Sequence, residues 1–218
     1  MIRKMLYGII IVIGILALYF FWSIKKTREL NANIQTAPGN QTFIEDTTSI
    51  TDLMDENKFW NIIDNSRKQS GGNYEKQCQL LTQLLKAEQR DDLIMFSNSF
   101  VTLQNEAYDW KLWAAAYIIN GGCSDDCFSD FRSWLIGQGK VAFENAVKDP
   151  ETLLQLQIEP DNWEGLQYSA MQAYKEKTGK EMSFAKLNFK QEPTGEHWNE
   201  DQQELKKLLP KLYEKYGN

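Results

Sequence analysis

The sequence predicts an all-α fold: a compact, multi-helix globular domain of seven to nine helices behind a single N-terminal transmembrane helix. Apolar residues of the globular part recur at helical spacing. No segment sustains the period-two alternation of a strand, and no run rich in Val, Ile and Thr lies between turn signals. With 42% hydrophobic and 12% aromatic residues, a chain of 218 residues can form one domain with a real core.

The N-terminal segment, residues 1–24, is predicted to be an uncleaved membrane anchor. The run from Met5 to Ile24 holds twenty residues without a charge. At 1.5 Å per residue such a helix spans roughly 30 Å, the thickness of a bilayer core. A cleaved signal peptide is the alternative, but the run is longer than the apolar region of such peptides, and no small-residue cleavage site follows it closely.

Residues 25–53 are polar, with a break at Pro38-Gly39, and are predicted to be a flexible linker to a globular domain at residues 54–218. The globular residues carry 19 basic and 26 acidic side chains, a net charge of −7. This charge repels nucleic-acid phosphates, so no nucleic-acid partner is expected. The expected partners are the membrane, through the N-terminal helix, and another protein.

Two signals bear on the side of the membrane. Two basic residues precede the apolar run and three follow it, which slightly favours a cytoplasmic C-terminus. The three cysteines show no obvious pairing, and unpaired thiols fit a reducing compartment. The sequence therefore predicts a single-pass membrane protein with its globular domain in the cytoplasm.

Capping residues and apolar stripes mark the first three helices of the globular domain. Asp55 is a good N-cap for a helix that Gly71-Gly72 ends. Cys78 lies on the stripe of the second helix, so its thiol is expected to be buried rather than reactive. The third helix begins near Asp91-Asp92, whose carboxylates suit a helix N-terminus. The three stripes are Phe59, Trp60 and Ile63; Tyr74, Cys78, Leu81 and Leu85; and Leu93, Phe96, Phe100, Leu103 and Ala107.

The run from Trp110 to Ile119 is predicted to be a buried central helix, because it has one charge in ten residues. Asn120-Gly121-Gly122 ends it, with glycine free to adopt the left-handed C-cap conformation. Ser124 is then the natural N-cap of the following helix, with Asp125 and Asp126 in its first turn. The inward face of that helix is expected to hold Phe128, Phe131, Trp134 and Leu135.

The rest of the chain is predicted to form shorter helices. One spans Val141 to Val147, and Pro150 takes the first position of the next, which Asp149 caps. A helix that starts at Asp161 is ended by Thr178-Gly179. Residues 180–198 are irregular, and a last helical stretch from about Asp201 to Tyr216 is broken by Pro210.

The candidate functional residues surround the break between the two central helices: Gly121, Gly122, Cys123, Ser124, Asp125, Asp126 and Arg132. A glycine loop before a helix can bind phosphate, but Asp125 and Asp126 would repel it. The carboxylates and thiols have too few further ligands nearby for zinc or magnesium, so no metal and no cofactor is expected. Catalysis by Cys123 would need a base, and the single histidine, His197, lies 74 positions away.

Three interpretations of this cluster remain open. It is structural if Ser124 and one aspartate cap the helix and the other aspartate pairs with Arg132 or another basic residue. It is a recognition surface if the Asp–Arg cluster binds a protein or a small polar ligand, which makes the domain a non-enzymatic interaction or regulatory module. It is a hydrolase-like site if Cys123, Asp125, Asp126 and Arg132 converge on one pocket. The non-enzymatic interpretation is preferred because no catalytic constellation is found, and the catalytic residues are unknown.

The run WKLWAAAYIINGGCSDDCFSDFRSWLIGQGK, residues 110–140, resembles the signature of domain-of-unknown-function family 4240, a bacterial family. The resemblance extends to FWNIID at 59–64, to Asp149-Pro150, to AYKEKTGKEM at 173–182 and to PKLYEKYG at 210–217, so it covers about residues 54–217. It implies a family fold and no established activity. It also implies that the transmembrane anchor is an addition to the usual soluble form, and that Cys127 is often glycine in other members.

Overall fold

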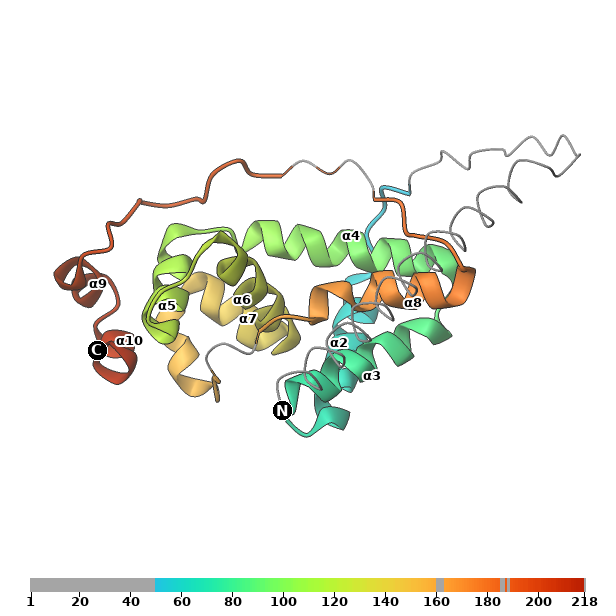
Figure 1. The fold of residues 1–218 in the computed structure, drawn as a ribbon, viewed down its shortest axis with the longest axis horizontal. Helices are drawn as coiled ribbons and strands as arrows, with labels where there is room; N and C mark the ends of the chain where they lie inside the picture. Colours follow the sequence, from blue (N-terminus) through green and yellow to red (C-terminus); the bar gives the residue numbers. More distant parts are fainter. Residues whose placement is uncertain (1–49, 160–162, 185–186, 188, 218) are drawn as a thin grey trace, which may run out of the picture. The chain divides into compact units, whose positions relative to one another are not determined.

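The structure, a computed structural model, describes residues 50–159, 163–184, 187 and 189–217 (Figure 1). This part of the chain holds nine α-helices, at the upper end of the predicted seven to nine, together with two short 3₁₀ helices and no strand. The all-α class is therefore confirmed. The elements are α2 (Glu56–Ser70), α3 (Tyr74–Ala87), α4 (Arg90–Glu106), α5 (Trp110–Asn120), α6 (Asp125–Gly137), α7 (Lys140–Lys148), η1 (Pro150–Gln155), η2 (Leu166–Tyr168), α8 (Ser169–Thr178), α9 (Gln202–Leu208) and α10 (Pro210–Tyr216).

The predicted anchor at residues 1–24 and nearly all of the predicted linker at 25–53 lie outside the described residues. Among the helices that are described, none has the length and apolar character needed to cross a bilayer. At the start of the described part, the side-chain amide of Asn98 donates hydrogen bonds to the carbonyl oxygens of Ile50 and Asp52 at 2.9 and 3.1 Å. The residues just before α2 therefore contact α4.

The described helices share one core. α2 packs against α3, α3 and α4 pack against α8, and α6 contacts α2, α4 and α7. Figure 1 shows the C-terminal helices α9 and α10 (red) beside α5, and both contact it. Segments far apart in the sequence thus meet around α5 and α6.

The predicted stripes supply most of this core. Phe59 of α2 stacks on Phe96 of α4 with ring centroids 4.7 Å apart. Phe131 of α6 contacts Trp163 at 4.9 Å, edge to face. The largest side chains that are completely buried are Phe59, Phe96, Phe128, Phe131, Phe143, Ile63, Leu81, Leu85, Leu93, Leu112, Leu135 and Ile136.

Most predicted helix ends are confirmed, and one is wrong. The Asp55 carboxylate accepts a hydrogen bond from the Lys58 N–H at 2.9 Å, as an N-cap does. Pro150 takes the first position of η1. The helix predicted from Asp161 begins only at Ser169, after η2, and Asp161 itself lies outside the described residues. The later start follows from Gly165, whose φ of 131° is incompatible with a helix.

α5 is less completely buried than its composition predicts. Its aliphatic side chains are buried, but Trp110, Trp113 and Tyr117 are only half-buried. These three residues lie at i, i+3 and i+7 and therefore share one face of the helix. The prediction of a fully buried central helix is wrong on this aromatic face.

Candidate functional site

The connection between α5 and α6 has the conformation that its sequence predicts. Gly121 has a φ of 66°, and its N–H donates to the Tyr117 carbonyl oxygen as in a left-handed C-cap. The Ser124 hydroxyl accepts a hydrogen bond from the Cys127 N–H at 3.4 Å and caps α6. The Asn120 amide donates to the Gly122 carbonyl at 3.1 Å. These caps fix the path of the chain between the two helices.

Gly121→Ala is expected to lower the free energy of unfolding by about 1 kcal/mol, because a Cβ disfavours the left-handed conformation. A Cβ at this position would meet no atom within 4 Å, so the loss is conformational rather than steric. Urea denaturation measures it. Gly121→Asn is the matched control and should lose less, since asparagine tolerates this conformation; equal losses for the two variants would contradict this account.

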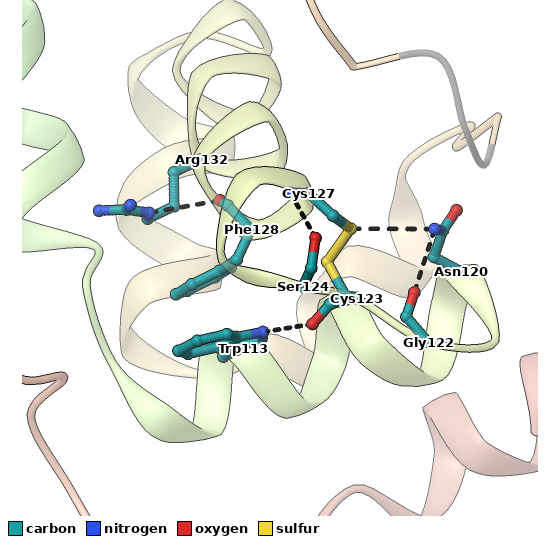
Figure 2. Close-up of a disulfide and its surroundings, with 8 residues drawn as sticks. All are labelled: Trp113, Asn120, Gly122, Cys123, Ser124, Cys127, Phe128 and Arg132. Atoms are coloured by element: carbon teal, nitrogen blue, oxygen red, sulfur yellow. Dashed lines mark hydrogen bonds between the residues drawn. A yellow bond between two sulfur atoms is a disulfide. The ribbon is translucent and has the colours of Figure 1, made fainter.

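Cys123 and Cys127 form a disulfide across the first turn of α6, with Cα atoms 5.2 Å apart (Figure 2). The interpretation that the cysteines are unpaired is therefore wrong for these two. A spacing of four residues at the start of a helix brings the side chains one turn apart, within reach of each other. A thiolate is the nucleophilic form of cysteine, so Cys123 has no nucleophile to offer while the disulfide is intact.

Arg132 lies apart from the predicted carboxylates. Its Nη1 donates to the Gln104 carbonyl oxygen at 2.7 Å, and its guanidinium carbon lies 4.7 and 4.9 Å from the ring centroids of Tyr108 and Phe128. Figure 2 shows the side chain directed away from the disulfide. Burial lowers the pKa of this guanidinium, which nevertheless stays charged near neutral pH. The Arg132 side chain therefore joins the end of α4 to its own helix, where its Nε donates to the Phe128 carbonyl oxygen at 3.3 Å.

An open cleft of about 540 Å³ lies beside the break. Its lining residues, here called the aromatic cleft, are Trp110, Trp113 and Tyr117 from α5, Cys123, Ser124 and Asp125 from the start of α6, and His197, Trp198, Asn199 and Glu200 from the C-terminal segment. The cleft thus brings together three of the predicted cluster residues. Gly121, Gly122, Asp126 and Arg132 do not line it.

The central ring of the aromatic cleft is held from both sides. Trp113 stacks between Trp110 and Phe128, with ring centroids 5.2 and 4.9 Å apart. Its indole N–H donates to the Cys123 carbonyl oxygen at 2.9 Å (Figure 2). The stack and this hydrogen bond fix the Trp113 ring against the break between the helices.

The C-terminal segment closes the other side of the cleft by hydrogen bonds to the start of α5. The Trp110 N–H donates to the Thr194 carbonyl oxygen at 2.9 Å, and the Thr194 N–H donates to the Tyr108 carbonyl oxygen at 3.0 Å. The indole N–H of Trp198, which is buried, donates to the Trp110 carbonyl oxygen at 2.7 Å. The walls of the cleft are therefore fixed before any ligand binds.

The charges in the cleft are negative. Asp125 and Glu200 are exposed carboxylates, neither has an ion pair among the described residues, and the lining contains no lysine or arginine. The Tyr117 hydroxyl donates to the Glu200 carboxylate at 3.2 Å. Burial, followed by this hydrogen bond and the charge of Glu200, raises the pKa of the Tyr117 phenol. Tyr117 is therefore a neutral hydrogen-bond donor at pH 7.

A second groove, of about 550 Å³, lies between α3 and α8. This groove and the aromatic cleft have similar volumes, but their lining residues differ. In the groove, Lys86 forms an ion pair with Glu176 at 2.6 Å, whereas the lining of the aromatic cleft contains no lysine or arginine. Cys78 lines the groove and is half-buried. Within the described ranges, no group of three or more His, Cys, Asp or Glu residues could hold a metal ion.

The Cys78 thiol is expected to react slowly, as its place on an apolar stripe predicts. Burial raises its pKa from 9.0 to about 11, so the reactive thiolate at pH 8 is about a hundredfold scarcer than in the unfolded chain. Alkylation by iodoacetamide, followed by mass spectrometry under non-reducing conditions, should show this ratio between native and urea-unfolded protein. Equal alkylation rates would contradict it.

Most residues of the aromatic cleft were not predicted as functional from the sequence. The spacing of Trp110, Trp113 and Tyr117 was a usable signal, because Trp and Tyr each have a polar group that prefers a partially exposed position. Residues 197–200 gave no such signal, since they lie in an irregular segment some eighty residues further along the chain.

The fold and the site define an all-α domain in which two central helices meet at a disulfide-linked break beside an aromatic cleft. A family model described as a protein of unknown function, DUF4240, matches residues 54–176, more than half of the chain, and the chain belongs to this family. The resemblance inferred from the signature is thus confirmed. No curated protein and no solved structure matches the chain. The matched residues include α5 and α6 and end before the segment at 197–200.

Proposed function

We propose that the domain is a non-enzymatic interaction module and that the aromatic cleft is its binding surface. The observation that carries this proposal is the face of α5, where Trp110, Trp113 and Tyr117 are half-buried on an otherwise buried helix. Partly exposed aromatic residues with polar tips are enriched at protein interfaces. The hydrogen bonds that hold the cleft reduce the ordering needed on binding.

A hydrolase-like function around Cys123, Asp125, Asp126 and Arg132 has less support. Cys123 is in a disulfide, and Arg132 is bonded to the Gln104 carbonyl. Of the two carboxylates, only Asp125 lines the cleft. The four side chains therefore offer neither a nucleophile with its base nor a pair of acids on one pocket.

Site-specific photo-crosslinking in the native cell tests the interaction module. A photoreactive residue at Asn199, which is exposed in the cleft, is expected to form a discrete protein adduct. The same residue at the exposed position Lys68 of α2 is the control and should form none. The adduct should be lost in a Tyr117→Ala variant that still folds. No adduct at position 199, or the same adduct from both positions, would contradict the proposal.

Membrane attachment by residues 1–24 is a second part of the proposal, supported by the twenty uncharged residues from Met5 to Ile24. Three basic residues follow the run and two precede it, which favours a cytoplasmic domain by one basic residue. The disulfide between Cys123 and Cys127 supports an oxidising compartment instead, because disulfides are rare in the cytosol. Because the disulfide is a stronger signal than a difference of one basic residue, we propose that the globular domain lies on the outer side of the membrane.

Protease added to spheroplasts distinguishes the two orientations. An outer domain is expected to be digested, whereas a cytoplasmic control protein stays intact. Full protection of the domain, with the chain in the membrane fraction, would restore the cytoplasmic orientation. Recovery of the intact chain in the soluble fraction would rule out the anchor itself.

A further inference from the structure

We propose that the aromatic cleft binds a basic side chain, of lysine or arginine, presented by a partner protein. This inference rests on the proposed function, to which it adds the chemistry of the partner. Charge, aromatic surface and size support it separately.

The negative charge of the cleft favours a positively charged ligand over a neutral one. Asp125 and Glu200 line the cleft, which contains no lysine or arginine, and within the part of the chain that the structure describes neither forms an ion pair. The surrounding domain adds to their potential, because residues 54–218 carry a net charge of −7. Such a field attracts cations to the cleft and repels anionic groups.

The aromatic surface offers a second interaction with a cation. A lysine or arginine over a tryptophan or tyrosine ring is attracted by the ring quadrupole within about 6 Å of the centroid. Trp110 and Tyr117 each keep part of their surface accessible. The same domain already holds a cation in this way, since Arg132 lies 4.7 Å from the centroid of Tyr108 and 4.9 Å from that of Phe128.

The dimensions of the cleft suit a side chain. Its volume of about 540 Å³ lies within the range of roughly 300–1,000 Å³ that is usual for small-ligand sites. The apolar stem of a lysine or arginine can lie on the rings while its charged end reaches a carboxylate. A neutral sugar would also stack on the rings, but it would leave both carboxylates without a counter-charge, so we favour the basic side chain.

Calorimetric titration of the full chain with the peptide (Gly-Arg)₅ tests the proposal. The peptide is expected to bind, and added salt should weaken binding because charges near the surface are screened over about 10 Å at 0.1 M salt. The double variant Asp125→Asn/Glu200→Gln should bind about tenfold more weakly, since it removes two charge interactions. The double variant Asp126→Asn/Glu196→Gln removes the same charge from exposed residues outside the cleft. This control should stay within about twofold of the original protein.

The comparison ligands are (Gly-Ser)₅ and cellohexaose. No binding of the arginine peptide, equal binding of either comparison ligand, or an equal loss in both double variants would overturn the proposal. The photo-crosslink from position 199 separates this inference from the function beneath it. If the Asp125→Asn/Glu200→Gln protein still forms the adduct at full yield, the cleft remains an interaction surface and its partner does not present a cation. If no adduct forms even in the original protein, the interaction module itself is wrong.

Discussion

Phe131→Ala is expected to lower the free energy of unfolding by about 3–5 kcal/mol, the usual loss for a phenylalanine truncated in a core. The Phe131 ring is completely buried, and its centroid lies 5.5 Å from that of Trp134 and 4.9 Å from that of Trp163. Removing it leaves a cavity where α6 meets the residues before α8. Urea denaturation, monitored by circular dichroism, measures the loss.

Phe189→Ala is the matched control because it makes the same chemical change at a side chain that is 52% exposed. Its expected loss is below about 1 kcal/mol, as for surface substitutions in general. Similar losses at the two positions would mean that α6 does not pack at the centre of the domain.

Arg132→Ala is expected to lower the free energy of unfolding by about 2–3 kcal/mol. It removes a charged hydrogen bond and leaves the Gln104 carbonyl, which accepts from Nη1 at 2.7 Å, without that partner. It also removes the cation that lies over the rings of Tyr108 and Phe128. The affinity for the arginine peptide should be unchanged, since Arg132 does not line the cleft.

Arg67→Ala is a close control, because Arg67 also donates from Nη1 to a backbone carbonyl at 2.7 Å, that of Gln138, but is exposed. Its expected loss is about 0.5–1 kcal/mol, because water replaces an exposed hydrogen bond. An Arg132 variant that keeps its stability and loses ligand binding would return Arg132 to the functional site, as the sequence analysis expected.

Local signals made much of the fold predictable. The caps at Asp55, Ser124 and Gly121 depend on residues within one turn of the helix end, so they can be read without knowing the tertiary structure. The start of α8 was not predictable in this way. Capping chemistry pointed to Asp161, whereas the backbone at Gly165 delays the helix to Ser169.

The candidate site was only partly predictable. Asp125 and Arg132 lie seven residues apart, close to two helical turns, so they share a face of α6. They are nevertheless about 10 Å apart along the axis, too far for an ion pair, and Arg132 instead donates a hydrogen bond to the Gln104 carbonyl at the end of α4.

The exposed aromatic face of α5 could not be predicted for a different reason. An apolar helix looks the same in composition whether its tryptophans fill a core or line a cleft, and Trp198, which completes the cleft, is brought in only by the tertiary fold.

Fluorine NMR of the full chain labelled with fluorotryptophan tests most directly whether the aromatic cleft is the binding surface. The chain has seven tryptophans, whose signals can be assigned by single Trp→Phe variants. On titration with (Gly-Arg)₅, the signals of the cleft residues Trp110, Trp113 and Trp198 should shift, and those of the core residues Trp60, Trp134 and Trp163 should stay. Shifts confined to the core residues, or no shift at any tryptophan, would contradict the account.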